Sequence, residues 1–189
     1  MEIVLLRHGK PAIAEGSKLS SSQFGVWVAE YNQVGIDLAL PPTKQAQETA
    51  AECDFVVCSH LPRSIESARA LGIDCIDVTD FLFREFEMPF ADLTTPRLLP
   101  ATWSGFYRVM WLAGFCANAE SYWQAKQRGQ TCVEHLLECA SSYRRVLFVG
   151  HGALLWFICK QLLSQGWSGR PARSPRDYWD FNVYNHAEM

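Results

Sequence analysis

The sequence predicts an α/β fold, a three-layer α/β/α sandwich around a largely parallel central sheet. Short apolar segments alternate with longer helical segments along the chain, which is the pattern of a sheet whose strands are connected through helices. The apolar segments are continuous runs rich in Val, Ile and Phe, as expected of strands that are covered on both faces. With 189 residues, of which 49% are hydrophobic, the chain is long enough for one packed core.

Four segments have the composition and length of buried strands, and Gly, Ser or charged residues bound them. They lie at residues 2–6, 54–59, 75–78 and 144–150. A fifth segment, 178–185, alternates apolar and polar residues in the manner of an edge strand.

Helical patterns fill the stretches between these strands. Residues 41–53 place prolines ahead of a Thr43 cap, residues 61–72 end in glycine, and a third helix is expected over roughly 118–142. A buried helix begins at Gly152, directly after the strand at 144–150.

The segment 87–117 interrupts this alternation of strands and helices. It contains three prolines, and its apolar residues follow neither a helical nor a strand period. We interpret it as an insertion that forms a cap, within a single domain that spans residues 1–189. The sequence holds no internal repeat and no low-complexity linker that would mark a domain boundary.

Charge and cysteine usage limit the environment and the partners of the chain. Seventeen Lys and Arg against twenty Asp and Glu leave a net charge of −3, which favours neither a nucleic-acid partner nor an anionic membrane. Seven cysteines without CxxC spacing indicate reduced thiols, and the absence of a basic leader or a long apolar run fits a protein of the cytoplasm. We expect a cytoplasmic protein that binds any anion through a local site.

Arginine or histidine residues follow the ends of three predicted strands. Arg7 and His8 follow the first strand, His151 follows the strand at 144–150, and Arg63 lies in the first helical turn after Ser59. Because the carboxyl ends of parallel strands line one crevice, we expect these two arginines and two histidines to converge.

Such a cluster predicts an oxyanion pocket, since unpaired buried cations are expensive and guanidinium groups match phosphate geometry. The helix that begins at Gly152 adds free backbone N–H groups. A neutral imidazole that is held by a backbone carbonyl through one nitrogen can attack phosphorus with the other, which forms a covalent phosphohistidine. This chemistry also needs a proton donor for the leaving oxygen.

Four motifs in order, "LLRHGKP", "CSHLPRSIESA", "FLFREFE" and "VGHGALL", resemble those of the histidine phosphatase superfamily, also called phosphoglycerate-mutase-like. The resemblance covers residues 3–155. It implies His8 as the nucleophile, Arg7 and Arg63 as phosphate ligands, and His151 as a further donor to the phosphoryl oxygens. It also implies a phosphoric monoester hydrolase that needs neither a cofactor nor a metal.

The same resemblance implies Glu85 as the proton donor, because the family places its acid after a pair such as "FR". Glu87 is the alternative donor. Apolar cover from Phe83 and Phe86 would favour the protonated carboxyl that this role requires.

Departures from the family pattern bear on the substrate. Lys10 stands where Glu or Gln is common, and "EFEMPFADL" has neither the Y-G nor the W-E-G that follows the acid in mutases and many sugar-phosphate phosphatases. A phosphatase acting on a small phosphorylated substrate or on phosphohistidine of a protein is therefore favoured over a mutase-type phosphotransferase. A phosphate-binding regulator without turnover is the other alternative.

Specificity is expected from the segments 87–117 and 11–24, and from residues beside the phosphate, with Gly9, Lys10 and Gly152 as candidates for substrate binding. These motifs leave the identity of the substrate and the oligomeric state open. His60 is left out of the predicted site as an exposed loop residue.

Overall fold

A computed structural model describes residues 1–14, 16–170 and 177–186, and the chain forms two compact units. The first unit comprises Met1–Pro11, Gly35–Glu85 and Arg128–Met189, and the second comprises Ala12–Val34 and Phe86–Gln127. The second unit therefore takes in the whole predicted insertion, together with most of the predicted specificity loop at 11–24, of which residue 15 lies outside the described residues.

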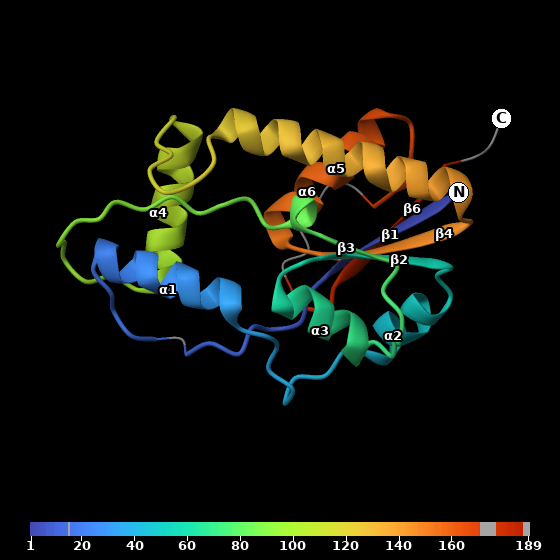
Figure 1. Cartoon of the computed structure of the whole chain (residues 1–189), viewed down its shortest axis with the longest axis horizontal. Helices are drawn as coiled ribbons and strands as arrows, with labels where there is room; N and C mark the ends of the chain where they lie inside the picture. Colours follow the sequence, from blue (N-terminus) through green and yellow to red (C-terminus); the bar gives the residue numbers. More distant parts are fainter. Residues whose placement is uncertain (15, 171–176, 187–189) are drawn as a thin grey trace. The chain divides into compact units, whose positions relative to one another are not determined.

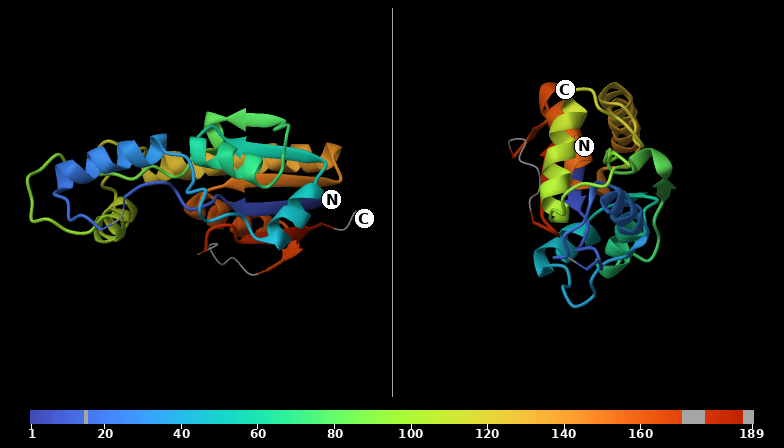
Figure 2. Two further views of the ribbon diagram at one scale, coloured as in Figure 1. Left: turned by 90° about the horizontal axis from the view of Figure 1, so that it is seen from below. Right: turned by 90° about the vertical axis from the view of Figure 1, so that its left-hand side faces the viewer.

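The first unit holds a six-stranded mixed sheet in the order β3-β2-β4-β1-β6-β5, and the left view of Figure 2 follows the strands across it. The pairs β1–β4, β2–β4 and β2–β3 are parallel, whereas β6 pairs antiparallel with β1 and β5. The strands are β1 (Glu2–Arg7), β2 (Phe55–Ser59), β3 (Val78–Asp80), β4 (Arg145–Gly150), β5 (Ser168–Gly169) and β6 (Phe181–Asn185). The predicted α/β fold with a largely parallel sheet is confirmed.

Both faces of the central strands are apolar, as the continuous Val, Leu and Ile runs predict. On one face, Val4 and Leu6 of β1 join Leu147 and Val149 of β4 in a core with the small residues of α2 and α3. The alternating residues, such as Phe148, are also fully buried. The central strands are thus covered by apolar packing on both faces of the sheet.

Four helices flank this sheet. They are α2 (Lys44–Ala51), α3 (Pro62–Ala70), α5 (Tyr122–Ser142) and α6 (Gly152–Ser164). In Figure 1, α2 and α3 lie on one face of the sheet, and α6 with the part of α5 after residue 127 lies on the other. Thr43 caps α2 by accepting a hydrogen bond from Ala46 N, and Pro62 occupies the first turn of α3, where its missing N–H is not needed.

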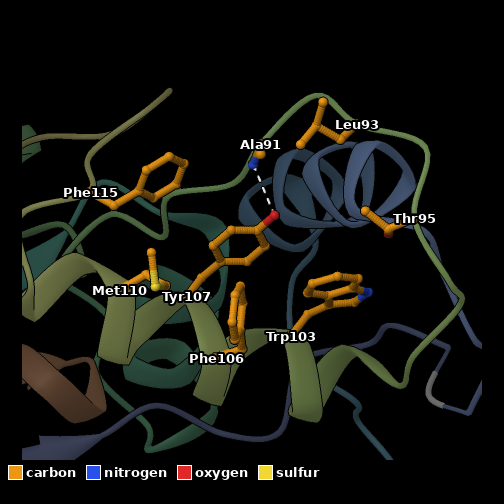
Figure 3. A pocket seen from close by; sticks show the side chains of 8 residues that line it. All are labelled: Ala91, Leu93, Thr95, Trp103, Phe106, Tyr107, Met110 and Phe115. Carbon is orange, nitrogen blue, oxygen red and sulfur yellow. Dashed lines mark hydrogen bonds between the residues drawn. The ribbon is translucent and has the colours of Figure 1, made fainter.

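The second unit contains α1 (Ser21–Gln33), α4 (Pro100–Leu112) and the first residues of α5. Phe24, Trp103 and Tyr107 form its aromatic core. Beside this core lies an apolar cavity of about 270 Å³, and Figure 3 shows the Tyr107 hydroxyl meeting the Ala91 N–H at its wall, 3.1 Å away. The cavity is lined by Ala91, Leu93, Thr95, Trp103, Phe106, Tyr107, Met110 and Phe115.

The sequence did not predict α1 and α4. The buried residues of α4 follow a helical period, but exposed apolar side chains such as Phe106 and Val109 stand between them and hide that period. For α1 a readable signal was present, because Ser20 and Gln23 form a capping box at its start.

Two strand predictions are corrected. The strand expected at 75–78 begins only at Val78, since the chain first pairs with β2 there. The segment expected as an edge strand at 178–185 forms β6 only over Phe181–Asn185, and β6 lies between β1 and the two-residue β5. None of the helices in the described part of the chain is long and apolar enough to cross a bilayer.

Candidate active site

His8 directly follows β1 and is buried, with 2% of its surface exposed. Its Nδ1 lies 2.7 Å from the carbonyl oxygen of Gly9. Because a carbonyl only accepts hydrogen bonds, Nδ1 carries the proton and Nε2 presents its lone pair. The Gly9 N–H in turn donates to Ser67 Oγ of α3 at 2.8 Å, so both sides of the His8–Gly9 peptide segment are fixed.

The electrostatic surroundings keep His8 neutral. Burial, followed by the positive charges of Arg63 and Arg7, lowers the pKa of His8 from 6.5 to about 3, and the Gly9 hydrogen bond opposes this shift only in part. A neutral imidazole is the form in which a histidine acts as a nucleophile.

His151 lies one residue beyond β4, and its backbone caps the N-terminus of α6. The register pairs Arg7 with Gly150, so that His8 and His151 leave neighbouring strands side by side, with ring centroids 5.1 Å apart. His151 is fully buried, and neither ring nitrogen has a hydrogen-bond partner among the described residues. Burial, with Arg63 and His8 next in importance, holds the pKa of His151 well below its usual value.

Arg63 belongs to the first turn of α3 and is only 1% exposed. Its neighbour Ser64 ties this turn to the sheet, because its Oγ donates to the Val149 carbonyl at 2.5 Å and accepts from Ser59 N at 3.1 Å. These bonds place the guanidinium where it lowers the pKa of both His8 and His151. The structure thus brings together the two histidines and two arginines that the sequence selects.

Glu85 lies in the same unit as this cluster. Its carboxylate oxygens accept hydrogen bonds from Ala153 N at 3.1 Å and Leu154 N at 3.0 Å, in the first turn of α6. The first N–H groups of a helix have no partner within the helix, so they are available to donate to side-chain oxygens such as these. Glu85 is therefore anchored two residues from His151.

Glu87, the alternative acid, belongs to the second unit. Its Oε2 accepts from Glu120 N at 2.6 Å, while its own N–H donates to Glu120 Oε1 at 3.2 Å. Arg108 donates to the Glu87 carbonyl at 3.2 Å. These bonds give Glu87 a role in holding the second unit together.

The remaining predicted residues lie within two positions of His8 or His151 in the sequence. Gly152 opens α6 and is half-buried. Lys10 is partly exposed, and its carbonyl accepts from Asp37 N at 2.7 Å. Gly9 lies against the Trp179 ring so closely that a Cβ there would overlap it.

Sequence reasoning misjudged the burial of one residue near the site and missed another residue that supports it. His60 is half-buried, not exposed, with its ring 4.8 Å from that of Phe81. Arg128 of α5 donates to the carbonyls of Leu82 and Arg84 at 2.8 Å and of Glu85 at 3.3 Å. A histidine after a strand and an arginine on a long helix are each too common to signal these roles.

The arrangement is a largely buried cluster of two histidines and two arginines, at the carboxyl ends of β1 and β4 and in the first turn of α3. Neutral imidazoles beside two guanidinium groups suit an oxyanion, because the guanidinium and imidazole N–H groups can donate hydrogen bonds to its oxygens. Across residues 1–14, 16–170 and 177–186, no three His, Cys, Asp or Glu side chains gather to hold a metal ion.

Comparison with known proteins also relates this chain to proteins that act on phosphate groups. A model of the histidine phosphatase superfamily (branch 1) matches residues 3–186. An acid phosphatase of Mycobacterium tuberculosis is 31% identical over 152 residues, which are 79% of this chain and 70% of that protein.

Two solved structures resemble the chain in fold. The product of an open reading frame of Mycobacterium tuberculosis is 22% identical, with a TM-score of 0.62 over 96% of this chain and 89% of that chain. A mycobacterial glucosyl-3-phosphoglycerate phosphatase is 19% identical, with a TM-score of 0.61 over 96% of this chain and 88% of that chain.

Proposed function

Because this chain belongs to branch 1 of the histidine phosphatase superfamily, we propose that it is a metal-independent phosphatase that hydrolyses phosphomonoesters, or phosphohistidine of a partner protein. The observation that carries the proposal is the pair of buried imidazoles, 5.1 Å apart between Arg-bearing elements, of which His151 has no partner for either nitrogen within the described residues. Buried polar groups are normally satisfied, and a phosphoryl oxygen would accept a hydrogen bond from the protonated ring nitrogen of His151.

In the first step, His8 Nε2 attacks phosphorus. A P–N bond forms, the P–O bond to the leaving group breaks, and the leaving oxygen takes a proton from Glu85. Arg7, Arg63 and His151 bind the equatorial oxygens, where preorganised positive charge and hydrogen-bond donors lower the barrier most.

In the second step, water attacks the phosphohistidine while Glu85 accepts its proton. The P–N bond breaks, inorganic phosphate leaves, and His8 regains its neutral form. The Gly9 carbonyl supports both steps because it keeps the proton of His8 on Nδ1 throughout.

The cluster and Lys10 support the substrate class that we propose. An ammonium group next to the motif suits a phosphoester with a second acidic group, and the acid phosphatase relative supports a hydrolase over a phosphotransferase. The seven cysteines are all free thiols, which supports a cytoplasmic setting for the reaction.

The test is hydrolysis of para-nitrophenyl phosphate and a panel of phosphorylated metabolites by the purified full chain. We expect activity that persists in EDTA and is inhibited by orthovanadate. His8→Ala should lower kcat by at least about a thousandfold, because it removes the nucleophile. A base-stable phosphoprotein should be trapped by rapid quench in the wild type and be missing in this variant.

His186→Ala is the matched control. His186 follows the end of β6, which runs antiparallel to β1, so it lies at the end of the sheet away from His8, and its ring contacts Trp167. The activity of this variant should equal that of the wild type. Unchanged hydrolysis in His8→Ala would contradict the mechanism. Tight phosphate binding without turnover across the whole panel would instead identify a phosphate-binding regulator.

A further inference from the structure

Residues 177–180, directly before β6, run beside the segment that carries the nucleophile. Arg7 N donates to the Asp180 carbonyl at 2.9 Å, and Trp179 N donates to the Arg7 carbonyl at 3.2 Å. These bonds continue the antiparallel pairing of β1 with β6 beyond Leu6 and Phe181. Two aromatic side chains are thereby held in register with the Arg-His-Gly motif.

Tyr178 contacts both charged and nucleophilic members of that motif. The Arg7 guanidinium carbon lies over the Tyr178 ring, 4.6 Å from its centroid, and the His8 ring centroid lies 5.9 Å away. The face of a phenol ring attracts a guanidinium without neutralising it. The N–H donors of arginine lie in the plane of the guanidinium, and an aromatic ring does not compete with a phosphate for them as a carboxylate partner would.

Trp179 packs against Gly9 of the motif. It is 6% exposed, and its backbone has φ of +67°, a conformation that bulky residues rarely adopt. The indole Nε1 donates to the Leu40 carbonyl at 2.9 Å, and its ring fills the space next to Gly9. Such conformations persist where the surroundings fix them, and they gather at functional sites.

We propose that Tyr178 and Trp179 are positioning residues for the phosphate site. Tyr178 holds the Arg7 guanidinium so that its N–H groups face the phosphoryl oxygens. Trp179 holds the backbone of Gly9, whose carbonyl orients His8 through Nδ1. The catalytic meaning of this pair rests on the proposed function, but its effect on the site is measurable with inorganic phosphate alone.

The first experiment compares Tyr178→Leu with Tyr178→Phe in the full chain, by calorimetric titration with inorganic phosphate. Loss of the ring should weaken phosphate binding roughly threefold to thirtyfold, the range of a cation–π contact, and should lower kcat/KM by a similar factor. Tyr178→Phe keeps the ring and should bind phosphate within about twofold of the wild type.

Tyr143→Leu is the matched control, because Tyr143 also stacks in the first unit, on Phe55 at 4.1 Å, away from the motif. It should bind phosphate like the wild type. A residue that merely covered apolar core would tolerate leucine, so unchanged phosphate affinity in a folded Tyr178→Leu overturns the role of Tyr178. Should that variant unfold, Tyr178→Met is measured in the same way.

The second experiment is a double-mutant cycle between Gly9→Ala and Trp179→Gly. Glycine adopts the φ of residue 179 without strain, and its introduction removes the ring that an alanine at position 9 would overlap. Gly9→Ala should weaken phosphate binding at least about tenfold in the wild type and less than about twofold when added to Trp179→Gly, since contacting residues couple. Equal effects in both backgrounds overturn the role of Trp179.

These measurements separate the two proposals. A wild type that binds phosphate without hydrolysing any ester, and loses that binding in Tyr178→Leu, overturns the phosphatase but supports the positioning pair. A wild type that hydrolyses esters, with phosphate affinity unchanged in folded Tyr178→Leu, overturns the pair alone. A wild type that binds no phosphate overturns both.

Discussion

Arg63 heads the large side chains that are buried almost completely in the described part of the chain. A guanidinium in that position is expensive unless it interacts with negative charge or hydrogen-bond acceptors. It lowers the pKa of two histidines that are already neutral through burial. The residue chemistry therefore suits a site that binds an anion.

Glu85 and Glu87, the two candidate proton donors, have different hydrogen-bond partners. Glu85 is bound by the first turn of α6 beside His151, whereas Glu87 exchanges hydrogen bonds with Glu120 in the second unit. We expect Glu85→Gln to lower kcat by about 10²–10⁴, as for loss of a general acid and base. Glu87→Gln should lower it less than about threefold, since its effect on proton transfer is indirect.

The check is steady-state hydrolysis of an alkyl phosphate and of para-nitrophenyl phosphate. The loss in Glu85→Gln should be larger with the alkyl ester, whose leaving oxygen needs a proton more. The reverse order of the two variants would make Glu87 the proton donor.

At the scale of elements, two helices hold Glu85, one through its carboxylate and the other through backbone carbonyls of its segment. The first turn of α6 binds its carboxylate, and Arg128 of α5 binds three carbonyls of the segment from Leu82 to Glu85. Cys132, one turn further along α5, adds a thiol that donates to the Leu82 carbonyl at 3.3 Å. Glu85 is thus positioned by long-range packing that no local motif encodes.

Arg128→Lys tests this arrangement. A lysine keeps the charge but lacks the fork that reaches several carbonyls, so the segment should shift and kcat should fall roughly tenfold. Adding Arg128→Lys to Glu85→Gln should cause little further loss in kcat if Arg128 acts through Glu85. Arg144→Lys, on an exposed ion pair with Asp54, is the control, and equal losses in both variants would contradict the role of Arg128.

For the whole molecule, burial of the histidines makes stability depend on pH. The pKa of His8 is about 3 when folded and about 6.5 when unfolded. Between these values the unfolded chain binds a proton that the folded chain does not, so folding stability falls as the pH falls below 6.5. His151 acts in the same direction, because burial and Arg63 also lower its pKa.

Urea unfolding at pH 7.5 and pH 4.5 in phosphate-free buffer measures this effect. The wild type should lose up to about 2.7 kcal/mol more of its free energy of unfolding over this range than His8→Asn. His186→Asn should behave like the wild type. Identical pH dependence in the wild type and His8→Asn would show that His8 titrates normally in the folded chain.

Local sequence determined the elements whose signal is complete within a few residues. The apolar runs of β1, β2 and β4 and the caps of α2 and α3 mark these elements without reference to the rest of the chain. Because parallel strands deliver their carboxyl ends to one edge, the convergence of Arg7, His8, Arg63 and His151 also followed from the sequence.

Only the tertiary structure decided which residues support that cluster. Arg128, Tyr178 and Trp179 lie far from the motifs in sequence and carry no local pattern, since their roles depend on contacts made across the sheet and between helices. The same holds for the separation of Glu85 from Glu87 into different units. Residue types and strand ends fix where an anion site forms, whereas packing fixes which side chains orient it, because orientation arises from neighbours that the chain brings together only when folded.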